Sequence, residues 1–348
     1  MNQRATIDDV AKLAGVSIAT VSRVISKSDR VRASTRAQVL QAIEDLHYQP
    51  DASARALASG RTYTVGCVIP TLDHSIFARA TQAMQTVLSD AGFQLLVGSS
   101  NYESNTELQV VRAFQQRGVD ALVLVGTDHA ASMWDAVTQW GKPVLLSWSC
   151  DPRLPSVGFD NVTIAKHMTE HLLSLGHERI AVVSGFTANN DRARSRIQGV
   201  RQALSAHGLR LPKELLIEQS YNLHGGRLAL QQLMQLDQPP TAIFCAMDLL
   251  AAGVLLEAQR LQIDVPRTLS VCGIDNHELA EVISPGLTTI SLPTYELGRI
   301  TAERVLSALS GETIPSQTIL PFELIVRGST AKMRATKRPR KSHAIHIH

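Results

Sequence analysis

The sequence predicts an all-α N-terminal domain with a helix-turn-helix arrangement, followed by a two-lobed α/β core built on doubly wound parallel sheets. Three observations lead to this fold class. Short helical patterns fill the first fifty residues, strand-like apolar runs alternate with amphipathic helices from Tyr63 onward, and 348 residues suffice for two or three domains. With 44% hydrophobic and 19% charged residues, the composition is that of a globular protein and not of a disordered one.

The first two helices are predicted from capping residues and apolar spacing. Thr6 starts the first helix with a capping-box pattern, Gly15 stops it, and Ser17 is placed to cap a second helix that ends at Ile25. In the second helix, the spacing turns three side chains inward and four outward, namely Val21, Val24 and Ile25 against Ile18, Ala19, Ser22 and Arg23.

A third helix is predicted from about Ser34 to Leu46. Two helices separated by a tight turn at residues 14–16 are typical of the helix-turn-helix motif, in which the second helix enters the major groove of DNA. A generic small helical domain shows the same pattern. From the residues alone, both interpretations stay open.

Residues 51–60 favour a helix but are fewer than the roughly 12–15 residues that an isolated helix needs in water. Pro50 separates them from the third helix, and Leu57 is their only large apolar residue. The segment is either a flexible linker or a hinge that folds only beside a twin segment on DNA.

The rest of the chain alternates between strands and helices. The predicted strands are Val65–Ile69, Gln94–Val97, Ala121–Val125, Val144–Leu146, Ile180–Val183, Ala242–Cys245 and Leu269–Ile274. The predicted helices are Ile76–Ala91, Thr106–Arg117, Ile164–Leu175, Arg196–His207, Gly226–Leu236 and Leu249–Leu261. So many units exceed one sheet, which predicts two lobes with a ligand cleft at the carboxyl ends of their strands.

Charge is distributed unevenly along the chain. Residues 1–62 contain nine Lys and Arg against six Asp and Glu, and residues 329–348 contain six Lys and Arg and no acid. The two ends therefore have net charges of +3 and +6. Because the net charge of the whole chain is only +3, residues 63–328 have a net charge of −6. Basic ends on an acidic body predict that a polyanion such as nucleic acid is presented to one end only.

Several classes of protein are not supported by the sequence. The four cysteines are far apart, which favours neither a disulfide framework nor a zinc site and fits a reducing cytosol. No apolar signal region and no run long enough to span a membrane is present, so we expect a cytoplasmic, nucleoid-associated protein. Common nucleotide-binding and hydrolase motifs are missing, so no enzyme activity, cofactor or metal is expected.

Two sets of residues carry a resemblance to a known family. In the N-terminal part they are Thr6-Ile7-Asp8-Asp9-Val10-Ala11, Ala14-Gly15-Val16-Ser17, Thr20-Val21-Ser22-Arg23-Val24-Ile25 and His47-Tyr48-Gln49-Pro50. Further along they are Gly158-Phe159-Asp160-Asn161, Gly176-His177, residues 239–245, Val265-Pro266 and Gly273-Ile274-Asp275-Asn276. The chain resembles the LacI/GalR family of bacterial transcription regulators through all but its last twenty or so residues.

The resemblance implies a domain organisation and a set of partners. It implies a DNA-binding headpiece at 1–48, a hinge at 49–62, an effector-binding and dimerisation core at 63–330 and a basic tail at 331–348. In the periplasmic-binding-protein-like core, one subdomain covers about 63–161 and 293–320, and the other about 162–290 and 321–330. The expected partners are a second copy of the chain, a pseudo-palindromic operator and a small effector.

By similarity, Ile18 and Ala19 lie where the family reads bases. Arg23 resembles a base-edge donor, and arginine suits the N7 and O6 acceptors of guanine. Leu57 matches the leucine that the family inserts into the minor groove, and Arg55 is expected to contact the backbone. The expected phosphate contacts are Thr6, Ser17, Thr20 and Ser22.

The resemblance also points to effector-binding residues in the cleft. They are Phe77, Trp148, Asp160, Arg196, Tyr221, Asp248 and Asp275. Aromatic rings stack on sugars or bases, and Asp and Arg hold hydroxyls or carboxylates. The alternative interpretation of Phe77 and Tyr221 is that they are ordinary core residues. The alternative for Asp248 is that it caps a helix that starts at Leu249.

Arg192 and Arg196 are four residues apart at one helix start, where anions are favoured. We therefore expect an acidic effector, such as a sugar acid like gluconate or a sugar phosphate, with another sugar derivative as the broader class. Residues 158–161 and 218–220 are also similar to gluconate-type members. Arg192 could instead be a solvated surface residue. The main alternative function is a periplasmic-type sugar-binding protein without a DNA role, and a sugar or nucleoside hydrolase is a weaker one.

Overall fold

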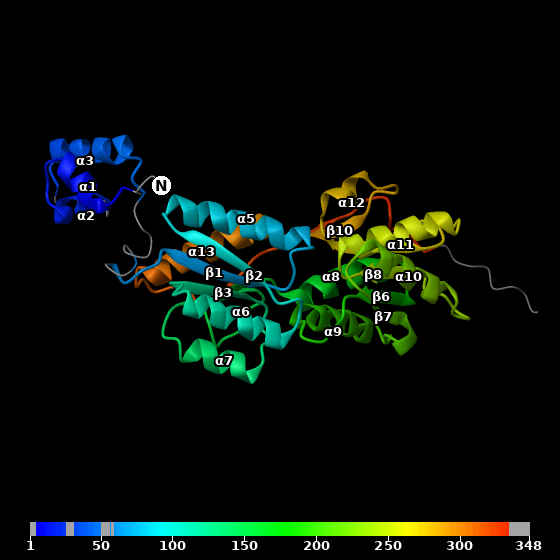
Figure 1. Ribbon diagram of the computed structural model, residues 1–348. Coiled ribbons are helices and arrows are strands. Elements are labelled where there is room, and N and C mark those ends of the chain that lie inside the picture. Colours follow the sequence, from blue (N-terminus) through cyan, green and yellow to red (C-terminus); the bar gives the residue numbers. More distant parts are fainter. Residues whose placement is uncertain (1–4, 26–30, 50–55, 57–58, 334–348) are drawn as a thin grey trace, which may run out of the picture. The chain divides into compact units, whose positions relative to one another are not determined.

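The structure is a computed structural model (Figure 1) that describes residues 5–25, 31–49, 56 and 59–333. The chain forms two compact units, residues 1–64 and 65–348. We call the first unit the headpiece and the second the core. The proposed wedge and backbone contact at Leu57 and Arg55, and the tail from residue 334, lie outside the described residues.

Three helices form the described part of the headpiece. They are α1 (Ile7–Leu13), α2 (Ile18–Ile25) and α3 (Ala33–Asp45). The predicted capping box is confirmed, because the Asp9 backbone N–H donates to Thr6 Oγ1 while the Thr6 backbone N–H donates to Asp9 Oδ2. Ser17 caps α2 by accepting from the backbone N–H of Thr20 at 3.3 Å.

A small apolar core holds these helices together. Its fully buried members are Val10, Ala11, Val21, Val24, Val39 and Ala42. Each helix contributes two of them: in α2 and α3 the two are three residues apart and share one helix face, whereas in α1 they are consecutive. The inward face of α2 packs in this apolar cluster of the headpiece, and its opposite face lies outside the cluster.

The described part of the core contains two six-stranded sheets, which define a first and a second lobe. The first sheet has the order β11-β5-β4-β3-β1-β2 and the second β12-β10-β9-β8-β6-β7. The first-lobe strands are β1 (Thr64–Ile69), β2 (Gln94–Ser99), β3 (Ala121–Val125), β4 (Val144–Trp148), β5 (Ser156–Gly158) and β11 (Gln317–Ile319). The second-lobe strands are β6 (Ile180–Ser184), β7 (Leu216–Glu218), β8 (Ala242–Cys245), β9 (Ser270–Asp275), β10 (Thr288–Ser291) and β12 (Glu323–Ile325).

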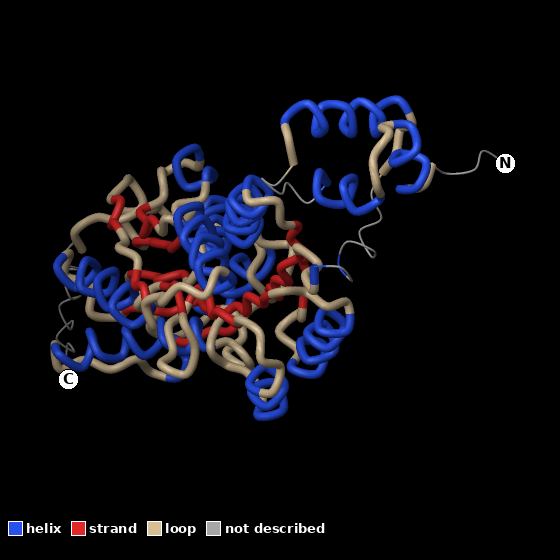
Figure 2. Tube along the Cα trace, turned by 90° about the vertical axis from the view of Figure 1, so that its left-hand side faces the viewer, coloured by secondary structure: helices blue, strands red, loops and turns tan. Residues whose placement is uncertain are grey.

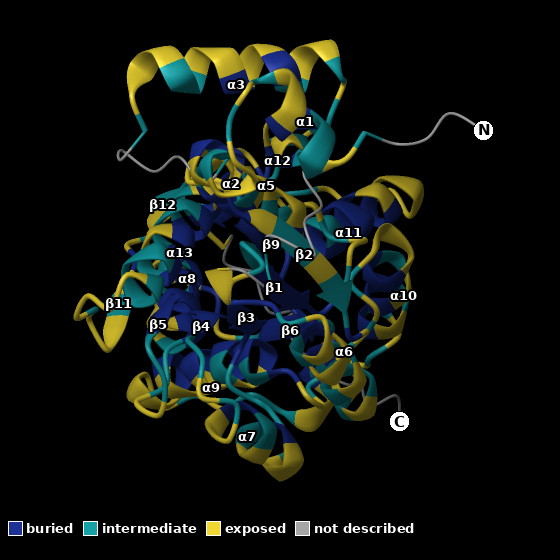
Figure 3. Ribbon diagram, turned by 60° about the vertical axis from the view of Figure 1, so that its left-hand side comes forward, coloured by how far each residue is buried: buried dark blue, intermediate teal, exposed yellow. Residues whose placement is uncertain are grey.

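Helices cover both faces of each sheet, as buried parallel strands require (Figures 1 and 2). Those of the first lobe are α5 (Ser75–Asp90), α6 (Ser104–Gln116), α7 (Ala131–Thr138) and α13 (Thr294–Leu309). Those of the second are α8 (Asn161–Ser174), α9 (Asp191–Ala206), α10 (Leu223–Met234), α11 (Asp248–Arg260) and α12 (Glu278–Val282), with a 3₁₀ turn at Lys213–Leu215. Figure 3 shows the central strands buried beneath these helices.

The predicted parallel sheets are confirmed, with one departure at an edge. β12 pairs antiparallel with β10, because the chain comes back to the second sheet from β11 of the first sheet and so enters it from the opposite end. The predicted strands and helices all occur, although α9 begins at Asp191, five residues before its predicted start, because Asn190 caps it there. Five short strands were missed, namely β5, β7, β10, β11 and β12. Each has only three or four residues, at least one of them polar, and so forms no continuous apolar run.

The chain crosses between the lobes three times in its described part. The crossings follow β5, β10 and β11. The first lobe is therefore completed late in the sequence, by α13 and β11. None of the described helices has the length and apolar content needed to cross a membrane.

Candidate functional site

The outward face of α2 carries the side chains that were predicted to read DNA bases. Ile18 is 47% exposed, and Ala19, Ser22 and Arg23 are also exposed. They lie on one face because their spacing follows the helical repeat, and buried Val21 and Val24 hold the opposite face against the headpiece core. This arrangement offers one helix face of the kind that fits a DNA major groove.

The predicted phosphate contacts differ in their electrostatic surroundings. Ser17 and Thr20 lie at the start of α2, whose first turn contains no acidic residue, and their hydroxyls are 2.9 Å apart. Thr6 lies at the start of α1 beside Asp9, and hydrogen bonds from Thr6 hold the pKa of that carboxyl below its usual range. The start of α2 therefore suits a phosphate better than the start of α1.

Two adjoining cavities lie between the lobes of the core. The larger, which we call the main cavity, has a volume of about 390 Å³ and is lined by Thr71, His74, residues 101–103, Phe186, residues 188–190 and residues 219–221. The smaller, which we call the Asp275 cavity, has a volume of about 130 Å³ and is lined by residues 73–76, residues 247–249, Asp275 and His277. His74 lines both cavities, which places them side by side.

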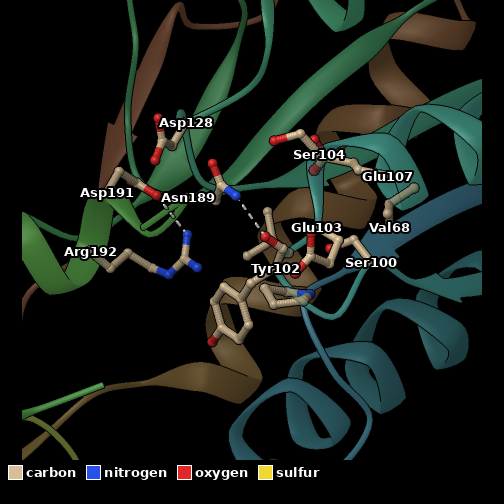
Figure 4. A pocket seen from close by; sticks show the side chains of 12 residues that line it. Val68, Ser100, Tyr102, Glu103, Ser104, Glu107, Asp128, Asn189, Asp191 and Arg192 are labelled. Carbon is tan, nitrogen blue, oxygen red and sulfur yellow. Dashed lines mark hydrogen bonds and ion pairs between the residues drawn. The ribbon is translucent and has the colours of Figure 1, made fainter. Parts of the chain in front are cut away.

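Arg192 lines a third hollow of about 20 Å³ (Figure 4), but its charge is already paired. Its Nη1 atom lies 2.8 Å from Asp191 Oδ1, and Arg192 is 7% exposed, so the alternative of a solvated Arg192 is wrong. Gly126 makes this position possible, since a Cβ atom there would lie 2.2 Å from Arg192 Nη1 and its φ of +89° favours glycine.

The same edge of the cleft carries polar contacts between the lobes. Thr127 Oγ1 donates to Asp191 Oδ2 at 3.2 Å, and Arg194 pairs with Asp128 at 2.7 Å. Asn189 Nδ2 donates to the Tyr102 carbonyl at 3.0 Å (Figure 4). The start of α9 is thus fastened to loops of the first lobe.

Arg196 is held by the second lobe beside Asp275. Its Nε donates to Asn161 Oδ1 at 2.9 Å and its Nη1 to the Ala246 carbonyl at 2.6 Å. Asp275 is 8% exposed, and its Oδ1 has no hydrogen-bond partner among the described residues. Burial raises the pKa of Asp275 to about 7, while Arg196 acts in the opposite direction.

Asp248 lines the Asp275 cavity, but both of its carboxylate oxygens have partners. Thr289 Oγ1 donates to Oδ1 at 2.6 Å and the His277 backbone N–H donates to Oδ2 at 2.8 Å. Burial, and then the nearby Asp275, raise its pKa well above the usual range. Asp248 is the first residue of α11 and makes no capping hydrogen bond, so the alternative reading of Asp248 as a helix cap is wrong.

The predicted aromatic residues take two different places. Phe77 and Trp148 are each 3% exposed and pack edge to face with ring centroids 4.9 Å apart, which makes them core residues behind the cleft. Tyr221 lines the main cavity and meets His74 edge-on at 5.5 Å. Trp148 and Asp275 have φ values of 73° and 112°, and non-glycine residues with such values concentrate at functional sites.

Asp160 lies outside the lining of the three cavities. It is exposed and caps α8, accepting from the Thr163 backbone N–H at 3.0 Å and from its hydroxyl at 2.6 Å. The next residue, Asn161, is the one that turns inward to Arg196. Sequence reasoning also missed His74, Tyr102 and Asn189, whose positions depend on how the two lobes meet.

Comparison with known proteins places these features in a family. Residues 6–51 match the family described as bacterial regulatory proteins, lacI family, and residues 169–330 match a periplasmic binding protein-like domain. Catabolite control protein A of Priestia megaterium is 31% identical over 93% of this chain and 99% of its own. The HTH-type transcriptional repressor CytR of Escherichia coli K12 is 31% identical over 94% of this chain and 96% of its own.

Solved structures agree with this result. The lac repressor dimer bound to operator and an anti-inducer has a TM-score of 0.84 at 25% identity, covering 94% of this chain and 100% of that chain. A complex of the transcriptional regulator CelR with cellobiose has a TM-score of 0.70 at 28% identity, with coverage of 94% and 100%. These relatives are transcriptional regulators and not enzymes, and they match the headpiece together with the core. The chain belongs to the LacI family of bacterial transcriptional regulators.

Proposed function

We propose that the chain is a repressor that binds a pseudo-palindromic operator as a homodimer and that a small effector in the cleft controls its affinity for DNA. The observation that carries this proposal is that one chain has both an outward α2 face in its headpiece and an interlobe cleft in its core. The cleft holds a buried carboxylate oxygen without a partner among the described residues. A sugar-binding protein without a DNA role would have no use for the first of these features.

In this proposal the operator is read mainly by α2. Arg23 donates to a guanine, and Ile18 and Ala19 sense the presence or absence of thymine methyl groups. Ser17, Thr20, Ser22 and Thr6 contact phosphates and fix the position of the helix. Leu57 opens a base step in the minor groove, with Arg55 on the adjacent backbone.

The effector is proposed to change the angle between the lobes. The boundaries proposed for the two subdomains fall at the three places where the chain crosses between the sheets. Rotation about these crossings would move one subdomain relative to the other and, in a dimer, alter the spacing of the two hinge segments. The coupling between effector and DNA is expected to be about 1–3 kcal/mol.

The sequence-based proposal for the effector is a sugar acid or another sugar derivative. The residues that line the cleft support a sugar derivative in general better than a sugar acid. Arg192 is paired with Asp191, and Arg196 donates to Asn161 and Ala246, so a carboxylate ligand would have to displace existing partners. Neither the main cavity nor the Asp275 cavity has a Lys or Arg in its described lining.

Selection of bound sequences from a random DNA pool tests this function. The intact protein should enrich one pseudo-palindromic sequence, and Arg23→Ala should relax the preference at one position per half-site with a loss of about 1–3 kcal/mol. Leu57→Ala should weaken operator binding while leaving effector binding unchanged. Failure of the intact protein to enrich any sequence would overturn the proposal.

A further inference from the structure

Two side chains that line the same cavity from opposite lobes each have a buried acceptor atom without a partner among the described residues. In the described part of the chain, His74 Nδ1 and Asp275 Oδ1 are buried and have no hydrogen-bond partner. Both residues line the Asp275 cavity, His74 from the first lobe and Asp275 from the second. A buried polar group left unpaired is costly, so two such groups on residues that line one cavity indicate a missing ligand group.

The chemistry of His74 makes its Nδ1 atom an acceptor. Burial lowers the pKa of His74, which keeps the imidazole neutral at neutral pH. A neutral imidazole carries one ring N–H, and with that proton on Nε2 the other nitrogen is free to accept. The remaining nitrogen, Nδ1, then carries a lone pair and needs a donor.

The charges around this cavity favour a cation over an anion. Its lining contains Asp73, Asp248 and Asp275 and has no Lys or Arg among the described residues. Two cations act on these carboxyls from outside the lining and lower their pKa: Arg196 acts on Asp275, and Arg327 acts on Asp248. The Nε and Nη1 donors of Arg196 are used by Asn161 and Ala246. No group of three or more His, Cys, Asp or Glu side chains in the described chain is arranged to hold a metal ion.

We propose that the effector is an amino sugar whose amine donates to Asp275 Oδ1 and His74 Nδ1. This assignment rests on the proposed role of the cleft as the effector site. A single hydroxyl supplies one donor, whereas an ammonium supplies three and also carries the charge that a buried carboxylate needs. The amine therefore satisfies both lobes at once.

The adjoining main cavity fits the rest of such a molecule. Its volume of about 390 Å³ is large enough for a hexose ring. Its lining offers the rings of Tyr221 and Phe186 for the apolar faces of a sugar and amide groups, such as those of Asn101, Asn190 and Gln219, for its hydroxyls. His74 stands where the two cavities meet, so it marks where the amine and the ring would join.

Calorimetric titration of the full-length protein with matched sugars tests the proposal. The probes are glucosamine, galactosamine and mannosamine, the parent hexoses, N-acetylglucosamine and gluconate. At least one amino sugar should bind more than 10-fold more tightly than its parent hexose, and N-acetylation should remove this advantage. Gluconate should bind more weakly than any of the amines.

Variants assign the effect to the two acceptors. Asp275→Asn and His74→Ala should each weaken binding of the amino sugar by about 10- to 100-fold and bring its affinity to that of the parent hexose. Asp90→Asn and His224→Ala, which change exposed residues of α5 and α10, serve as controls and should leave the affinity unchanged. Unaltered selectivity in both cleft variants would overturn the assignment.

The outcomes separate this proposal from the proposed function. A protein that enriches an operator but binds none of the amines, or binds the hexose or acid as tightly, keeps its regulator role and contradicts the amine. A protein that binds an amino sugar through His74 and Asp275 but enriches no DNA supports the amine and contradicts the repressor.

Discussion

Arg192 and Asp275 are two buried charges at the same cleft, and they differ in how their partners are supplied. Arg192 pairs with the residue before it, Asp191, at 2.8 Å, and the neighbouring residues fasten the two lobes. Asp275 has Arg196 nearby, yet its Oδ1 has no partner among the described residues. A charge satisfied by the chain itself holds the fold, whereas one left open at a cavity is available to a ligand.

The largest effect is expected from Asp275→Asn, measured as core stability against pH. The pKa of Asp275 is raised by burial to about 7 from an ordinary value of 3.8. The folded state therefore holds this proton more tightly, and the resulting stability is present below pH 4 and lost as the pH rises through 7. The loss in the wild type is on the order of 4 kcal/mol at most, and the Asn variant should not show it.

Urea unfolding followed by tryptophan fluorescence checks this, because all three tryptophans lie in the core. The variant should gain stability over the wild type between pH 6 and pH 8 and show no gain at pH 4. An equal pH dependence in both proteins would mean that Asp275 is already satisfied. Taking the difference between the two proteins removes the contribution of buried histidines such as His74.

Removing Arg192 from its buried ion pair with Asp191 should destabilise the core by about 3 kcal/mol. Arg192→Met keeps the length of the side chain but leaves Asp191 buried without its cation. The double variant with Asp191→Asn should recover part of this loss, as measured by a double-mutant cycle in urea. If the single variant unfolds at the wild-type midpoint, the pair is not structural.

A smaller loss of stability is expected from Gly126→Ala, whose added methyl group would collide with the Arg192–Asp191 pair. The new Cβ atom would lie 2.2 Å from Arg192 Nη1, and the φ of +89° is strained for alanine. We expect a loss of about 2 kcal/mol. Gly92→Ala is the matched control, since its φ of +80° adds the same strain with nothing within 4 Å. Equal thermal shifts in the two variants would leave no role for the contact with Arg192.

The smallest effect is expected from Arg194→Ala, which removes the exposed ion pair with Asp128. Both side chains are partly solvated, at 47% and 33% exposure, so the loss of stability should be below about 1 kcal/mol. The loss should shrink further in 0.5 M salt, because the pair is screened. A loss as large as that of Arg192→Met would show that burial does not distinguish the two pairs.

The sequence predicted the architecture well because its signals are local. Continuous apolar runs marked the central strands, and the capping residues Thr6 and Ser17 marked the helix starts of the headpiece. Edge strands such as β11 escaped because three residues, two of them exposed, are too few to show a period. Helix α12 is also short, because its five residues make little more than one turn.

The site was predicted in part, and its gaps come from contacts made over long distances in the sequence. Arg196 and Asp275 came from the family resemblance; the structure places Asp275 in the lining of a cavity and Arg196 close to Asp275 but outside that lining. Between the adjacent residues Asp160 and Asn161, only the turn at the start of α8 decides which one faces Arg196. His74 acquires its role from the second lobe, which no local pattern reports.

The late return of the chain to its first lobe has a consequence for synthesis on the ribosome. Helix α13 packs on α5, and Gly298 lies so close that a Cβ atom there would be 2.0 Å from the Ala80 carbonyl oxygen. About two hundred residues separate the two helices, which is roughly 10–40 s of translation. During that interval the face of α5 that α13 covers stays exposed, so nascent chains of this protein should depend on chaperones before they depend on any effector.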